Sequence, residues 1–159
     1  MIPRFVLADM LYKWLENEVE AFVEGGSFFR LIKSTQPAED VDVSSPWAFW
    51  SANQCNFKGY APVAGPTGGE EGGWLPGELV TNRFRTEKIE VEFEYDAEAE
   101  GGVVGPQTAR YVVWHAVDGD GVERVLCAWR LPNDKVFTND DDKIKLKLSL
   151  SDLNIEHVA

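Results

Sequence analysis

The chain has 159 residues and a formal net charge of −12, from 27 acidic and 15 basic residues. A chain of this length fits one domain with a sizeable core. Its negative field repels phosphate backbones and anionic lipid surfaces, which argues against nucleic acid and membrane as partners. The two cysteines, Cys55 and Cys127, match no metal-ligand or redox spacing and predict no disulfide framework. No segment predicts a signal-peptide core or a membrane span, so a soluble protein made in a reducing cytoplasm is expected.

Residues 5–23 carry apolar side chains at helical spacing, which predicts one amphipathic helix that ends at Gly25 and Gly26. The apolar stripe comprises Leu7, Met10, Leu11, Trp14, Leu15, Val19, Phe22 and Val23. We expect this stripe to cover a sheet, with a seam between subunits as the alternative. The predicted organisation is a helix over residues 1–26 packed on the body, followed by a single β-sandwich domain over residues 27–159.

After the helix, the pattern changes to short β-type runs separated by Gly, Pro, Asn and Asp. Extended segments are predicted at residues 27–33, 56–63, 79–95, 108–117, 122–131 and 143–150. Residues 89–95 and 143–150 alternate apolar with charged side chains, so one face of each strand is expected in the core and the other in solvent. The turn at residues 118–121 (Asp-Gly-Asp-Gly) suits a tight hairpin. The sequence therefore predicts a mainly β fold, an antiparallel, jelly-roll-like β-sandwich preceded by one N-terminal amphipathic α-helix.

The sequence contains no recognisable catalytic set. Its two histidines are His115, within a predicted strand, and His157, near the end of the chain. No nucleophile elbow, phosphate-binding glycine loop or dinucleotide fingerprint is present. We therefore predict no catalytic, cofactor-binding or metal-binding residues and no enzyme activity. A glycosidase pair among the many carboxylates stays open, because the separation that defines such a pair is a property of the fold.

Two acidic clusters could in principle hold a hard cation. Residues 118–121 begin like a calcium-binding loop, but Trp129 stands where the closing bidentate glutamate belongs, so a hairpin turn is favoured. Residues 139–142 (Asn-Asp-Asp-Asp) gather oxygen ligands, although a solvated turn before a strand is the favoured interpretation. Whether residues 139–142 hold a cation stays open at this point.

Four of the large aromatic side chains lie in segments that look like loops. They are Trp47, Phe49, Trp50 and Trp74. Large aromatics in Gly- and Pro-rich segments either fold back onto the core or form an apolar docking surface. We predict that these four contribute to an interface with another protein; stacking on a sugar is the alternative.

The order of several segments resembles a class of small virion proteins. The helix over residues 7–23 is followed by FFRLIKSTQP (28–37), FKGYAPV (57–63), the long hairpin at 110–133 and KIKLKLSL (143–150). Together they resemble small tailed-bacteriophage proteins with a β-sandwich or jelly-roll body that decorate or cement the capsid. The chain departs from that pattern in its loop at 64–77.

The resemblance implies a non-enzymatic virion structural protein, made in the host cytoplasm and carried on the capsid surface. It further implies a homo-oligomer, with a trimer as the favoured form, and contact with the major capsid protein or other virion proteins. No cofactor is expected. The alternatives are a carbohydrate-binding or adhesion module of jelly-roll type, and a tail or connector component.

Overall fold

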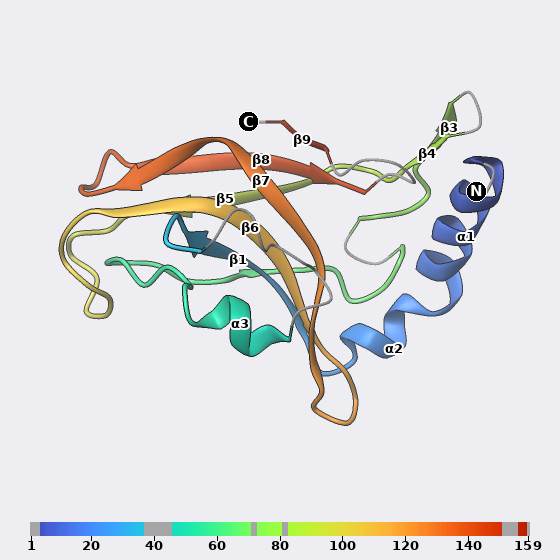
Figure 1. Cartoon of the computed structure of the whole chain (residues 1–159), viewed down its shortest axis with the longest axis horizontal. Helices are drawn as coiled ribbons and strands as arrows, with labels where there is room; N and C mark the ends of the chain where they lie inside the picture. The colour runs from blue at the N-terminus through green and yellow to red at the C-terminus, as the bar shows by residue number, and fades with distance from the viewer. Residues whose placement is uncertain (1–3, 37–45, 71–72, 81–82, 151–155, 159) are drawn as a thin grey trace.

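A computed structural model of the chain describes residues 4–36, 46–70, 73–80, 83–150 and 156–158 (Figure 1). The fold is mainly β with a helical N-terminus, as predicted, and every pair of named strands is antiparallel. The elements in chain order are α1 (Arg4–Asn17), α2 (Val19–Val23), β1 (Ser27–Lys33), α3 (Trp47–Ser51), β2 (Val63–Ala64), β3 (Glu78–Val80), β4 (Arg83–Arg85), β5 (Ile89–Glu94), β6 (Gln107–Val117), β7 (Glu123–Phe137), β8 (Lys143–Ser149) and β9 (Glu156–Val158).

The described strands form three groups. A four-stranded sheet has the order β2-β1-β6-β7, a three-stranded sheet has the order β5-β8-β9, and β3 and β4 form a hairpin of their own. The predicted hairpin at residues 118–121 is confirmed and joins the two longest strands, with Val117 opposite Glu123. Gly121 in this turn has φ +80°, a conformation that glycine adopts without steric cost.

The N-terminal helix is interrupted, which corrects the prediction of one continuous helix over residues 5–23. Glu18 has φ −122° and separates α1 from α2. The stripe packs on the sheets, since Leu15, Val19 and Val23 enter the apolar core and α1 lies at one end of the molecule against β4 (Figure 1). There Tyr12 meets Phe84 edge to face, with ring centroids 5.4 Å apart. Met10, a predicted stripe residue, is 56% exposed.

The helical segment ends where it was predicted to end, at Gly25. The Gly25 N–H donates to the carbonyl of Val117 at 2.7 Å, and the Val117 N–H donates to the carbonyl of Gly26 at 2.8 Å. A Cβ on Gly25 would lie 2.6 Å from the carbonyl oxygen of Asp118, so only glycine fits this close approach. The pair of hydrogen bonds ties the end of α2 to the end of β6.

One large apolar cluster is shared by the four-stranded and the three-stranded sheets. The alternation predicted for residues 89–95 and 143–150 is confirmed, since their apolar side chains enter this cluster and the charged ones stay in solvent. Each fully buried large apolar side chain contributes roughly 1.5–3 kcal/mol relative to an exposed one. The members of this apolar cluster include Phe29, Trp114 and Trp129 from the larger sheet and Val91, Phe93, Leu146 and Leu148 from the smaller one.

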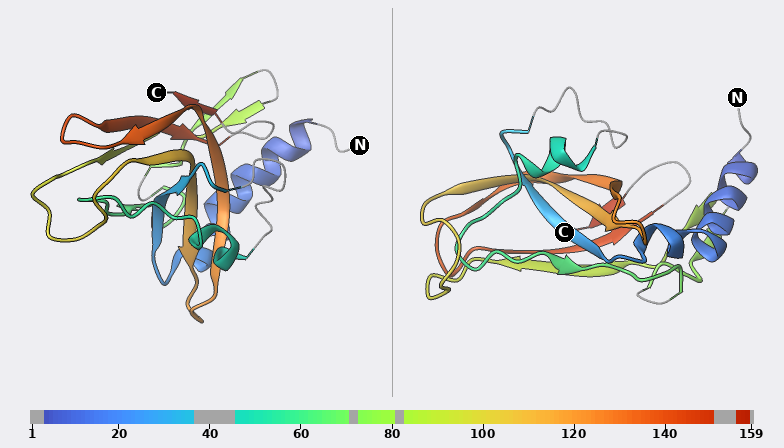
Figure 2. Two further views of the ribbon diagram at one scale, coloured as in Figure 1. Left: turned by 60° about the vertical axis from the view of Figure 1, so that its left-hand side comes forward. Right: turned by 90° about the horizontal axis from the view of Figure 1, so that it is seen from below.

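The opposite face of the four-stranded sheet is also covered, and we call it the outer face. Here α3 packs on a second apolar cluster that includes Ile32, Tyr111 and Val113. Figure 2 shows α3 on the side of this sheet that faces away from β5 and β8. Strand β6 is therefore buried on both faces along most of its length. This helical cover thus comes from one of the segments predicted to look like loops.

Candidate interaction surface

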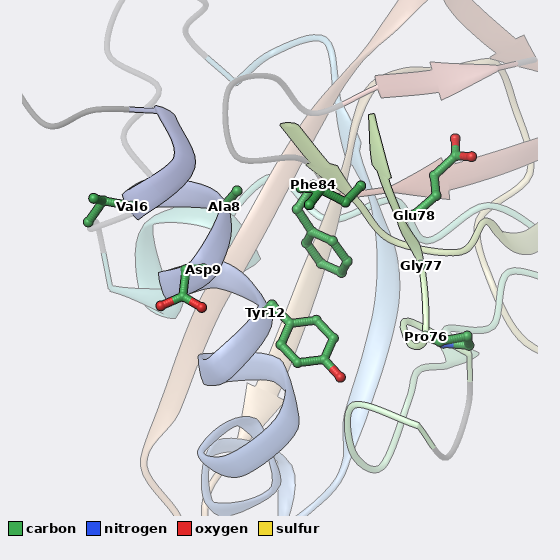
Figure 3. A pocket seen from close by; sticks show the side chains of 9 residues that line it. Val6, Ala8, Asp9, Tyr12, Pro76, Gly77, Glu78 and Phe84 are labelled. Atoms are coloured by element: carbon green, nitrogen blue, oxygen red, sulfur yellow. The ribbon is translucent and has the colours of Figure 1, made fainter. Parts of the chain in front are cut away.

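An apolar hollow lies between α1 and the β3–β4 hairpin, and we call it the end groove (Figure 3). Its volume is about 560 Å³. Ala8, Tyr12 and Phe84 supply apolar surface, while Asp9 and Glu78 bring carboxylates to its edge. A hollow of this size accommodates one or two large side chains of another molecule.

One large apolar side chain of the end groove's lining stays in solvent, since Leu79 is 68% exposed. Leu79 is the cross-strand partner of Phe84, so both side chains lie on one face of the hairpin. Phe84 is buried against Tyr12, whereas Leu79 extends beyond the helix. The groove therefore continues into an exposed apolar margin.

The predicted interface is wrong for Trp50 and Trp74, because both side chains are fully buried. Trp74 packs among Phe29, Trp114 and Trp129, with ring centroids at 6.2, 5.3 and 6.4 Å. The segment that carries Trp74 places this ring inside the apolar core. Trp50 is the buried anchor of α3. Neither ring is available for another protein or for a sugar.

The other two predicted interface residues, Trp47 and Phe49, are half-buried on the outer face. Trp47 stacks on the imidazole of His115 with ring centroids 4.1 Å apart and planes at 22°. Phe49 meets Trp50 edge to face at 5.8 Å. The structure thus brings Trp47 and Phe49 together on α3 and separates them from Trp74, which lies on the other side of the sheet.

His115 is the polar centre of the outer face, and its imidazole is almost completely buried. The Nε–H of Arg30 donates to Nδ1 at 3.0 Å, so Nδ1 carries no proton and the ring is neutral. Nε2 lies 3.2 Å from Oε1 of Glu123, whose side chain is half exposed. Burial and the Arg30 charge lower the pKa of His115, although Glu123 opposes them. The prediction of a histidine within a sheet is confirmed.

The carboxylates of the two acidic turns have internal partners. Oδ1 of Asp118 accepts the N–H groups of Asp120 and Val122 at 3.0 and 2.9 Å, and Oδ2 pairs with Arg124. Oδ2 of Asp142 accepts the N–H groups of Thr138 and Asn139 at 2.7 and 3.0 Å. The described residues contain no group of three or more His, Cys, Asp or Glu side chains placed to hold a metal ion.

The glutamates of β5 face lysines of β8. Glu90, Glu92 and Glu94 are the register partners of Lys147, Lys145 and Lys143. One of the diagonal pairs is an ion pair, from Lys145 Nζ to Glu90 Oε1 at 2.9 Å. Exposed pairs of this kind contribute little stability each. The arrangement is a solvated charged face, as predicted, with the signs of charge segregated by strand.

The two cysteine thiols are buried. Burial raises the pKa of the Cys55 thiol to about 12 and also raises that of Cys127, so neither is a nucleophile at neutral pH. In the described part of the chain, none of the helices combines the length and apolar character needed to cross a membrane.

Comparison with known proteins finds no matching family model, no matching curated protein and no matching solved structure.

Sequence reasoning missed the residues that define both surfaces. Leu79 was placed in an ordinary strand. Arg30 was passed over inside an apolar run, although a charged residue in a strand with both faces buried is itself a signal. The end groove, in contrast, depends on how α1 meets the hairpin, and no local pattern encodes that contact.

Proposed function

We propose that the protein is a non-enzymatic structural protein of a tailed-bacteriophage virion, of the kind that decorates or cements the capsid. On this proposal it assembles as a homo-oligomer, such as a trimer, and binds the major capsid protein on the capsid surface. Its body is then a jelly-roll-like β-sandwich, in which the two larger sheets face each other across the shared core. The observation that carries the proposal is the end groove with Leu79 exposed in its lining.

An uncovered apolar groove at one end of a rigid β body suits an assembly protein. Isolated apolar side chains in solvent are common, but one that lines an apolar hollow, as Leu79 does, marks a contact surface. The net charge of −12 keeps copies apart unless a specific contact outweighs the repulsion. Assembly through the end groove would bury Leu79 and would leave the acidic faces in solvent.

The aromatic side chains argue against the alternative of a carbohydrate-binding module. Sugar stacking needs an exposed aromatic ring, and Trp50 and Trp74 are buried. The large hydrophobic residues exposed in the described part of the chain are Met10, Leu79, Val103, Val104, Val122 and Val136, none of them aromatic. The proposal of protein contacts therefore accounts for these exposed residues better than the proposal of sugar contacts.

Light scattering tests the proposed function directly. The native mass of the purified protein is measured alone and after mixing with isolated capsid shells. We expect a small closed oligomer that binds the shells in saturable numbers. A monomer that does not bind the shells would refute the proposal.

A double variant tests the role of the end groove. Val6→Gln with Leu79→Gln replaces two apolar side chains of the groove lining, neither of them buried, and should leave the fold intact, because surface changes alter stability by about 0.5 kcal/mol or less. We expect this variant to lose oligomerisation or shell binding. The matched control is Val103→Gln with Val104→Gln, at exposed apolar residues outside the groove lining, which should behave as wild type. Loss in both variants, or in neither, would exclude the groove as the contact.

A further inference from the structure

We propose that Arg30 is the centre of a carboxylate-binding site on the outer face of the four-stranded sheet. The site lies on β1 beneath the edge of α3 and is separate from the end groove. It adds to the proposed function a chemical class of ligand, a carboxylate that the chain does not itself supply.

The guanidinium of Arg30 is held in one orientation. Its Cζ lies 5.1 Å from the centroid of the Phe28 ring and 5.4 Å from that of the Trp47 ring. Its Nε–H is committed to Nδ1 of the buried His115 at 3.0 Å. Two aromatic contacts and one hydrogen bond to a buried ring restrict a side chain that is otherwise highly flexible. A ligand therefore meets a guanidinium that has already lost most of its rotational freedom.

Among the described residues, Arg30 differs from Arg110, Arg124 and Arg130 in lacking an anionic partner. Arg110 and Arg130 both pair with Asp134, and Arg124 pairs with Asp118. Among the residues that the structure describes, no carboxylate forms an ion pair with Arg30, in a chain that has 27 acidic residues.

Glu123 acts electrostatically on Arg30 and His115, but its carboxylate does not form an ion pair with Arg30. Glu123 raises the pKa of Arg30, but its carboxylate meets Nε2 of His115. Nε2 lies across the imidazole ring from Nδ1, the atom that Arg30 contacts. Burial lowers the pKa of Arg30, as expected for a cation removed from water with incomplete compensation. An incoming carboxylate would supply that compensation.

The geometry left open on Arg30 suits a planar anion. Its two Nη atoms donate to no group among the described residues, and neither is fully buried there. A guanidinium presents its two Nη groups as a fork that matches the two oxygens of a carboxylate. The neighbouring Phe28 and Trp47 rings lower the local polarity, which strengthens that contact.

A carboxylate can reach this site as a small free anion or as an acidic side chain of another protein. The chemistry of recognition is the same in both cases, because the fork contacts only the carboxylate oxygens. An acidic side chain on another protein would make Arg30 and Trp47 an anchor pair, and these residue types dominate the energetics of protein interfaces.

The test is an NMR titration of the isolated protein, which follows the Arg30 Nε–H signal. The probes are sodium acetate and an acetylated tetraglutamate peptide, with sodium chloride at equal ionic strength as the reference. We expect a saturable shift of the Arg30 signal with acetate or with the peptide and none with chloride. A signal that does not move with either carboxylate overturns the proposal.

Two conservative variants sharpen the result. Arg30→Lys keeps the positive charge but removes the planar fork, and we expect carboxylate binding to weaken by about tenfold. The binding of this variant is read from the indole N–H signal of Trp47, with the other amide signals as the check on its fold. Arg130→Lys is the matched control, because Arg130 lies 5.3 Å from the Tyr111 ring centroid but already pairs with Asp134. Equal binding by wild type and Arg30→Lys would overturn the proposal.

The two probes distinguish the sources of the carboxylate. Peptide binding at least about tenfold tighter than acetate binding would identify an acidic segment of a protein as the ligand. Equal affinities per carboxylate would identify a small free anion, and both results support the site. Since no capsid shells are used, the outcome is independent of whether the proposed virion function is correct.

Discussion

The two faces of the four-stranded sheet are built from the same strands but serve different ends. The inner face carries Phe29, Trp114 and Trp129, whose rings pack with Trp74 into one continuous core. The outer face carries Arg30 and His115 among its apolar residues, under the short helix α3. The difference teaches that aromatic content alone does not distinguish a core from a binding surface. What distinguishes a binding surface is a polar group beside the ring whose hydrogen-bond donors have no partner in the protein.

The largest expected difference in stability between the two faces comes from removing one aromatic ring from each. Trp74→Ala should lower the free energy of unfolding by about 3–5 kcal/mol, because it opens a large cavity in the core. Trp47→Ala should lower it by only about 1–2 kcal/mol, the size of a ring stack and a cation–π contact at a half-buried site. Urea unfolding followed by far-UV circular dichroism measures both. Equal losses would mean that the outer face is as much a part of the core as the inner one.

A smaller effect separates the polar groups of the two faces. On the inner face, Ser27 Oγ accepts from the Trp114 indole at 3.0 Å and donates to the carbonyl of Pro66 at 2.8 Å. Ser27→Ala leaves both buried groups without this partner and should lower the unfolding free energy by about 1–3 kcal/mol. The matched control is Ser51→Ala on α3, where the hydroxyl donates to the Ala48 carbonyl near the surface at 3.3 Å. A loss in the control as large as that in Ser27→Ala would contradict the distinction.

The smallest expected effect is a dependence of stability on pH that belongs to the outer face. The pKa of His115 in the folded protein lies below its ordinary value of 6.5, first because of burial and then because of Arg30. As the pH falls through about 6.5, the unfolded chain binds the proton first, so acid favours unfolding. Below the folded pKa, both states carry the proton and the dependence ends.

His115→Gln isolates this contribution from those of the many carboxylates. Glutamine has no proton to gain and still offers an oxygen to the Arg30 Nε–H. We expect the stability advantage of wild type over this variant to shrink between pH 7.5 and pH 5.5, by at most about 1.4 kcal/mol per pH unit. Urea unfolding at several pH values measures the difference. A constant difference across this range would show that His115 titrates alike in the folded and unfolded states.

Much of the fold could be predicted from local patterns, because a strand with one solvated face records its burial in every second residue. This holds for β5 and β8, and for the hairpin whose turn at residues 118–121 has the chemistry that positive φ requires. The break at Glu18 was not predictable in this way, because the apolar periodicity runs on through it. The packing of α1 on β4 is a tertiary contact without a local signal.

The candidate sites could be predicted only in part, for a related reason. Trp50 and Trp74 lie in segments with the composition of loops, and composition does not say whether a loop crosses the surface or closes the core. Trp74 closes the core. Arg30 and His115 are 85 positions apart in the chain and meet only because Phe28 lies opposite His115 in the register of β1 and β6. Register between distant strands is what sequence patterns specify least.

The charged face formed by β5 and β8 also affects the self-association of this protein at high concentration. Among the described strands, β5 forms a hydrogen-bonded ladder only with β8, and residues 59–63 lie along its other side without such a ladder. A strand edge without a ladder is a template for another strand, and antiparallel pairing of two β5 edges would set glutamates against glutamates. The lysines that neutralise this face belong to the inner neighbour and are already matched. Segregating the two signs of charge by strand thus permits the native pairing and discourages growth of the sheet into fibres.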